Sequence, residues 1–107
     1  LLGLGVDGHT ASLFPGSPVV KEIFRTVAAV HAAAATVPQR FTLTLPVLNA
    51  AARVLLLVAG SEKAKVVKAP LSEPATLPAA MVRPATGELV WIIDRAAAAL
   101  LPNAGAR

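Results

Sequence analysis

The stretch VLLLVAGSEKAKVV, residues 54–67, decides the fold class. It opens with an apolar run of strand length, which is typical of a central parallel strand covered on both faces. Ser61 follows as a good N-cap, and Val66 and Val67 belong to the apolar stripe of a helix whose length Pro70 limits. A strand that leads directly into a helix indicates a βα unit.

Strands and helices alternate through the rest of the chain. Residues 1–5 (LLGLG) look like the end of a buried strand, residues 26–32 predict a second, and residues 89–93 predict a last one that runs into a helix at Asp94. Short helical turns are expected at residues 10–16, at 17–24 with Ser17 as N-cap before Pro18, and at 46–51 after Pro46. We therefore predict an α/β fold with a largely parallel sheet flanked by helices.

The segment RFTLTL, residues 40–45, alternates strictly between apolar and polar side chains. This period of two predicts a half-buried strand. The expected buried face carries the apolar side chains, and the expected polar face carries Arg40 and the two threonines. The buried set is Phe41, Leu43 and Leu45.

Composition excludes several function classes. The 107 residues include no cysteine, so thiolate metal sites and thiol chemistry are excluded, and 55% of them are apolar, which argues against disorder. The apolar runs fall short of the roughly 20 residues that span a bilayer. The net charge of +4 is scattered and lacks interleaved aromatic residues, so a nucleic-acid partner is not expected. Without a visible signal peptide, the default compartment is the cytoplasm.

Chemistry is expected beyond the carboxyl ends of strands, where open α/β sheets bind ligands. Asp7, Gly8 and His9 follow the first strand in a glycine turn. An imidazole takes and returns a proton near neutral pH, and Asp7 is close enough to orient it. The alternative is that Asp7 caps the following turn and His9 packs beneath it. Too few ligands are found for a metal, and we interpret His31 as an ordinary strand residue.

Two cations are candidates for an anionic ligand. Lys63 lies in the first turn of the predicted helix, where the helix dipole and free backbone N–H groups favour an anion. If the two strands are neighbours, Lys63 and His9 face one crevice. Arg40 could bind a phosphate with two parallel hydrogen bonds, although both cations could equally be solvated. Thr10 and Ser12 fit capping roles better than nucleophilic ones. Gly5, Gly8, Thr10 and Ser61 are the further candidates to line the site.

The run LLGLGVDGHTASLFPG, residues 1–16, closely resembles the signature of the 6-phosphogluconolactonases, within the wider family that includes glucosamine-6-phosphate isomerases and deaminases. The resemblance continues in order through residues 40–67 and 77–98. It implies a cytoplasmic enzyme that hydrolyses 6-phospho-D-glucono-1,5-lactone, a small phosphorylated sugar lactone, without metal or organic cofactor.

Residue roles follow from the same resemblance. His9 would activate water against the lactone carbonyl, Asp7 would orient His9, and Lys63, more than Arg40, would contact the phosphate. Asn49 matches the family pattern and could serve only to tie its loop. The isomerase branch typically carries a glutamate where this chain has Phe14, and an apolar ring performs no acid–base chemistry, so the resemblance favours the lactonase branch.

The sequence departs from the family at its front. Full members are roughly twice as long and carry a phosphate loop that is not found here, and Val6 stands where they commonly have proline. We therefore expect residues 1–107 to be the C-terminal part of a single α/β domain, with weak or no activity alone. The alternatives are an aminosugar-phosphate isomerase or deaminase, a sugar-phosphate-sensing domain of a transcriptional regulator, and an inactive remnant. The sequence predicts no oligomeric state.

Overall fold

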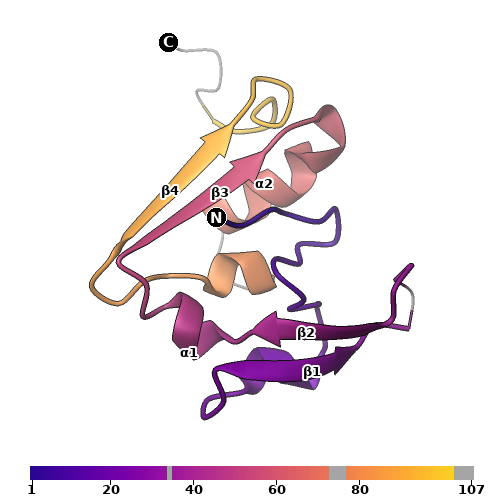
Figure 1. Ribbon diagram of the computed structural model, residues 1–107. Coiled ribbons are helices and arrows are strands. Elements are labelled where there is room, and N and C mark those ends of the chain that lie inside the picture. The colour runs from indigo at the N-terminus through magenta and orange to yellow at the C-terminus, as the bar shows by residue number, and fades with distance from the viewer. Residues whose placement is uncertain (34, 73–76, 103–107) are drawn as a thin grey trace.

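The computed structural model of the protein describes residues 1–33, 35–72 and 77–102. Its fold is α/β, as predicted (Figure 1). In chain order the elements are the 3-10 helix η1 (Pro18–Lys21), strands β1 (Val27–His31) and β2 (Gln39–Leu43), helix α1 (Leu45–Leu48), strand β3 (Arg53–Val58), the 3-10 helix η2 (Ser61–Lys63), helix α2 (Ala64–Ser72), the 3-10 helix η3 (Pro78–Met81) and strand β4 (Glu88–Ile93).

The parallel sheet is centred on β3. On one side β3 pairs with β4 in parallel along its whole length, from Arg53 opposite Glu88 to Val58 opposite Ile93. On the other side Leu2 forms a parallel bridge to β3, with its N–H 2.8 Å from the Leu55 carbonyl and its own carbonyl 2.9 Å from the Leu57 N–H. This bridge confirms the expectation that the first segment and β3 are neighbours.

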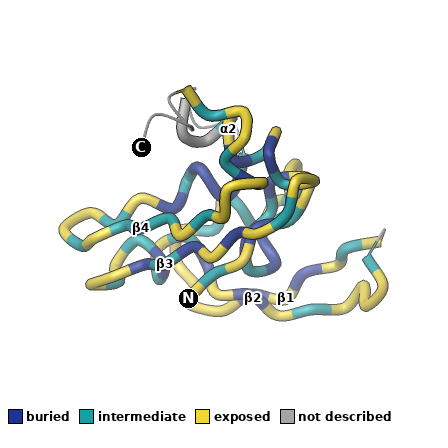
Figure 2. Tube along the Cα trace, turned by 90° about the horizontal axis from the view of Figure 1, so that it is seen from above, coloured by how far each residue is buried: buried dark blue, intermediate teal, exposed yellow. Residues whose placement is uncertain are grey.

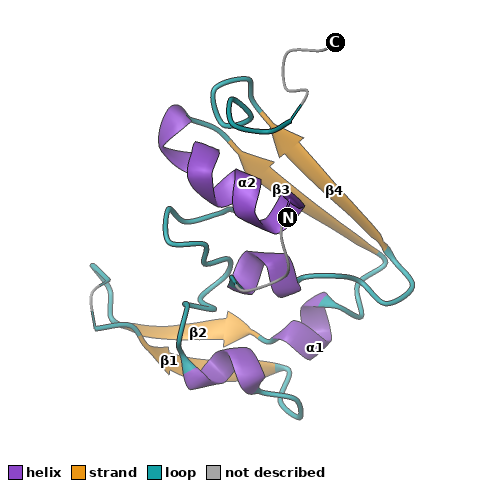
Figure 3. Ribbon diagram, turned by 180° about the vertical axis from the view of Figure 1, so that it is seen from behind, coloured by secondary structure: helices purple, strands orange, loops and turns teal. Residues whose placement is uncertain are grey.

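One face of this sheet carries the core, and α2 and η3 lie on that side of β3 (Figure 3). Val54, Leu56 and Val58 alternate inward along β3 and are almost fully buried. Leu57 points to the other face and is 54% exposed. The prediction that both faces of β3 are covered is therefore wrong for this chain. Leu1 is exposed as well, so the buried part of the first segment is Leu4.

Strands β1 and β2 form a separate antiparallel hairpin, and β2 turns the opposite face inward from the one predicted. Thr42 and Thr44, which follow each other on the inner face, are 4% and 0% exposed, whereas Phe41 is 79% exposed. Buried and exposed positions alternate along the hairpin (Figure 2). The prediction failed because both threonine hydroxyls find backbone partners. The Thr42 hydroxyl accepts from the Ser12 N–H, and that of Thr44 donates to the Arg25 carbonyl.

Two predicted helices are replaced by turns. After β4 the chain makes successive turns, in which the Asp94 carboxylate accepts hydrogen bonds from the N–H groups of Gly60 and Ala97. Up to residue 102, where the described part ends, one helical bond of the i to i+4 type follows, from the Ala98 N–H to the Asp94 carbonyl. Near the N-terminus, Thr10 and Leu13 close a tight turn in place of a helical one, with Ala11 at φ 51°.

The predicted helix starts agree with the structure better than the predicted N-cap residues do. Pro18 opens η1, as expected, whereas α1 begins one residue earlier than expected and has Pro46 as its second residue. Ser17 is the N-cap residue of η1 but makes no side-chain cap bond, and Gly60 takes the N-cap position that was expected for Ser61. Helix α2 continues through Pro70 to Ser72, so the proline lies in its last turn rather than ending it.

Asn49 ties its loop, which is the structural role that the sequence analysis left open for it. Its side-chain amide donates to the Met81 carbonyl at 3.1 Å and its side-chain oxygen accepts from the Arg83 N–H at 2.7 Å. Its own carbonyl accepts from the Ala85 N–H. These bonds fix the segment after η3 against the end of α1.

Within the described residues, no helix is both long enough and apolar enough to cross a membrane.

We expect Thr44→Val to destabilise the protein by about 0.5–1.5 kcal/mol, because it removes the hydroxyl that donates to the Arg25 carbonyl in a partly buried hydrogen bond. Thr44→Ser is the matched control, since it keeps the hydroxyl. Urea unfolding of the natural-length protein measures both. An unfolding midpoint for the valine variant equal to that of the wild type would contradict the inward orientation of β2.

Candidate active site

The turn that follows the Leu2 bridge is closed by its own backbone. The Gly5 N–H donates to the His9 carbonyl at 2.8 Å, and the Gly8 N–H donates to the Gly5 carbonyl at 3.0 Å. The His9 ring lies directly over Gly5: a Cβ added there would come within 2.1 Å of the ring Nδ1. Glycine is therefore required at position 5 by the close approach of the imidazole.

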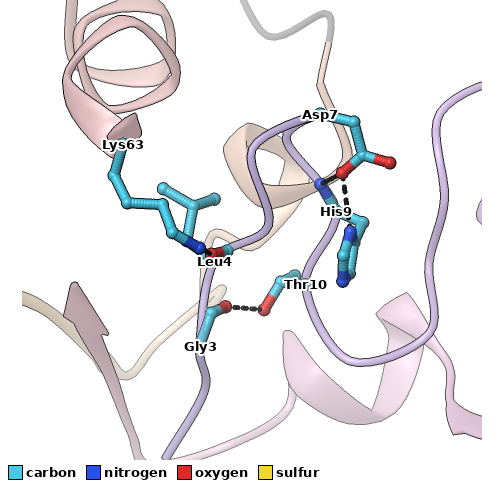
Figure 4. Close-up of polar contacts among 6 residues, drawn as sticks. All are labelled: Gly3, Leu4, Asp7, His9, Thr10 and Lys63. Atoms are coloured by element: carbon cyan, nitrogen blue, oxygen red, sulfur yellow. Dashed lines mark hydrogen bonds and ion pairs between the residues drawn. The ribbon is translucent and has the colours of Figure 1, made fainter. Parts of the chain in front are cut away.

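Asp7 and His9 form the central polar contact of this turn (Figure 4). Oδ1 of Asp7 lies 2.6 Å from the ring Nδ1 and accepts the His9 backbone N–H at 3.0 Å. An ionised carboxylate only accepts hydrogen bonds, so this contact favours the tautomer with the proton on Nδ1 and leaves Nε2 free to accept a proton. Partial burial raises the pKa of the Asp7 carboxyl, but the hydrogen bonds and charge of His9 outweigh it, and the pKa lies below its ordinary value of 3.8.

Gly8 and Thr10 anchor the turn to the rest of the molecule. Gly8 has φ 91°, and a Cβ there would come within 2.7 Å of the Leu77 side chain. Its carbonyl accepts the Ala79 N–H from η3 at 3.1 Å. The buried Thr10 hydroxyl donates to the Gly3 carbonyl at 2.8 Å. Thr10 thus ties the turn to the first segment in place of the capping role that was expected.

A cavity of about 650 Å³ opens beside His9. The rings of His9 and Phe14 stack with centroids 4.5 Å apart and planes inclined by 38°. The Arg40 guanidinium also lies over the Phe14 ring, with its Cζ 5.5 Å from the ring centroid. Nε of Arg40 donates to the Val37 carbonyl at 2.8 Å, which fixes the side chain from the hairpin. The structure therefore brings Arg40 to the same cavity as Asp7 and His9.

Lys63 reaches the other side of the same turn. It extends from η2 and donates through Nζ to the Leu4 carbonyl (Figure 4). A second cavity, of about 410 Å³, is lined by Lys63, His9, Thr10 and Gly5 among others. His9 thus lies on the wall of both cavities, with Arg40 in one and Lys63 in the other, and the expected approach of Lys63 and His9 is confirmed.

Two of the predicted features differ in the structure. Ser61 is exposed and lines neither cavity. The Gly60 N–H at the start of η2 already has an anionic partner, because both carboxylate oxygens of Asp94 lie 3.2 Å from it. This role of Asp94 was not predicted from the sequence. The signal that could have indicated it is the position of an aspartate directly after the neighbouring strand.

Phe14 was not predicted as a site residue, although the resemblance placed it where the isomerase branch carries a glutamate. The sequence offered no signal that its ring would contact a base and a cation at once, since those contacts cross from the turn to β2.

No group of three or more histidine, cysteine, aspartate or glutamate side chains converges within the ranges that the structure describes. His31 is exposed at the end of β1, outside both cavities.

Comparison with known proteins gives a consistent family. The sequence profile of glucosamine-6-phosphate isomerases/6-phosphogluconolactonase matches residues 1–91. The 6-phosphogluconolactonase of Rattus norvegicus is 52% identical over 102 residues, covering 94% of this chain and 40% of the rat protein. The corresponding human protein is 50% identical over 103 residues, with the same two shares covered.

Solved structures agree with this relationship. The structure of 6-phosphogluconolactonase from Trypanosoma brucei has a TM-score of 0.82 at 34% identity, covering 94% of this chain and 41% of that chain. The present chain therefore spans about two fifths of the length of the curated relatives it matches.

We expect Gly5→Ala to destabilise the natural-length protein by about 1–3 kcal/mol, because the new methyl group overlaps the His9 ring and must displace it. Gly3→Ala is the matched control. A Cβ at that position meets nothing within 4 Å, so its stability should equal or slightly exceed that of the wild type. Chemical denaturation compares the two, and equal stability of both variants would contradict the close approach at Gly5.

Proposed function

The chain belongs to the family of glucosamine-6-phosphate isomerases and 6-phosphogluconolactonases, and from this premise we propose that it carries the general base of a 6-phosphogluconolactonase. The proposed reaction is hydrolysis of 6-phospho-D-glucono-1,5-lactone to 6-phosphogluconate. The observation that carries the proposal is the 2.6 Å contact between Asp7 and the His9 Nδ1, which leaves Nε2 as an acceptor at the wall of two cavities.

Water is the nucleophile in the proposed mechanism. Nε2 of His9 takes a proton from a water molecule as that water attacks the lactone carbonyl carbon. The bond from this carbon to the ring oxygen then breaks, and the imidazolium returns the proton to the departing oxygen. Asp7 holds the ring in the required tautomer and stabilises its cationic form. Water is added across one ester bond, so no cofactor takes part in the scheme.

Two cations, one in each cavity, are the candidates for the substrate phosphate. Lys63 is the preferred contact: although one proton of its amine is donated to Leu4, two remain for a ligand in the smaller cavity. Arg40, in the larger cavity, is the alternative contact. Among the described residues, its Nη groups have no hydrogen-bond partner, while its Nε is held by Val37.

The lactonase branch is preferred to the isomerase branch because of Phe14. Its ring lies against His9, at the sequence position where the isomerases typically carry a glutamate. A phenyl ring neither accepts nor donates the protons that sugar isomerisation moves between carbon atoms. We further propose a cytoplasmic location, in keeping with the absence of cysteine from the sequence.

We expect His9→Ala to lower kcat for lactone hydrolysis by about 100-fold or more, which is the usual contribution of general-base catalysis. The assay uses the natural-length protein and freshly generated substrate, with spontaneous hydrolysis subtracted. His31→Ala is the matched control, because this histidine lies outside both cavities. A His9→Ala variant as fast as the wild type would show that another group activates the water.

We expect Lys63→Met to raise KM for the lactone by about 10- to 100-fold, the cost of a lost charge-assisted hydrogen bond, with a smaller change in kcat. Arg40→Met should raise KM less. Lys65→Met removes an exposed lysine two residues along the chain and serves as the control. Unchanged KM in both the Lys63 and the Arg40 variants would exclude these side chains as phosphate contacts.

A further inference from the structure

Phe14 contacts two functional groups that come from different parts of the chain. Its ring is 4.5 Å from the His9 ring, which belongs to the glycine turn, and 5.5 Å from the Arg40 guanidinium carbon, which belongs to β2. All three side chains line the cavity of about 650 Å³. Phe14 is therefore the one side chain among these that connects the proposed base to a proposed phosphate contact.

The backbone that carries Phe14 is anchored. The preceding residue, Leu13, is fully buried in the core cluster that includes Leu48 and Leu56. The Leu13 N–H also closes the tight turn onto the Thr10 carbonyl at 2.9 Å. The position from which the Phe14 side chain starts is therefore fixed relative to the core, and its ring meets His9 and Arg40 from that position.

The chemistry of an aromatic ring suits both neighbours. The face of a phenyl ring attracts cations, and Arg40 is cationic throughout. His9 becomes cationic only when it has taken a proton from water. A ring in contact with both groups holds Arg40 in the cavity while favouring the charged imidazole that forms during the reaction.

We propose that Phe14 is a positioning residue that sets the placement of His9 and Arg40 together on the wall of this cavity. This inference rests on the proposed lactonase function. It assigns Phe14 a role in both substrate affinity, through Arg40, and turnover, through His9.

The test compares Phe14→Leu with Phe14→Tyr in the natural-length protein. Leucine keeps the apolar character but removes the aromatic face, so we expect kcat to fall by about tenfold or more and KM to rise by about threefold. Tyrosine keeps the ring and should restore both constants to near the wild-type values. Phe24→Leu removes an aromatic ring that is 88% exposed and should leave both unchanged.

A structural measurement separates this proposal from the proposed function. The ¹⁵N chemical shifts of the His9 ring report which nitrogen carries the proton, and the Arg40 Nε–H signal reports the guanidinium environment. We expect Phe14→Leu to disturb both signals and Phe14→Tyr to preserve them. If the wild type does not hydrolyse the lactone, the proposed function fails, and these signals still decide the positioning role. Undisturbed signals in the leucine variant, or a tyrosine variant as impaired as the leucine variant, would overturn it.

Discussion

The two backbone hydrogen bonds between Leu2 and β3 are the constraint on which the rest of the site depends. They hold the chain start parallel to β3, so that both segments end at the same edge of the sheet. The glycine turn after one segment and η2 after the other then lie side by side. Lys63 can bond the Leu4 carbonyl only because this register places η2 beside the turn.

Once these two segments are held together, short-range contacts form most of the site. Gly5 leaves room for an imidazole, Asp7 selects its tautomer, and the Thr10 hydroxyl closes the turn on Gly3. The hairpin adds Arg40 from a different part of the chain. The resulting arrangement puts His9 on the wall of two cavities that each hold one cation, which suits the anionic substrate of the proposed reaction.

Sequence reasoning reached the local parts of this arrangement and missed the tertiary ones. The apolar run before Gly60 was sufficient to predict β3, and the spacing of Asp7 and His9 was sufficient to predict their contact. The orientation of β2 could not be predicted from alternation, because Thr42 and Thr44 are buried by hydrogen bonds to Ser12 and Arg25, far away in the sequence. Phe14 was missed as a site residue for the same reason, since its partner Arg40 comes from β2.

The reversed orientation of β2 also determines how the hairpin meets its surroundings. Val27 and Leu43 pair across the two strands and Ala29 pairs with Phe41, so this part of the outward face of the hairpin is apolar in this chain. Such a face favours self-association as concentration rises, and it lies on the opposite side of the hairpin from the buried threonines. Solubility can therefore be adjusted at Phe41 or Leu43 with a charged residue, without altering the hydrogen bonds that hold β2 in place.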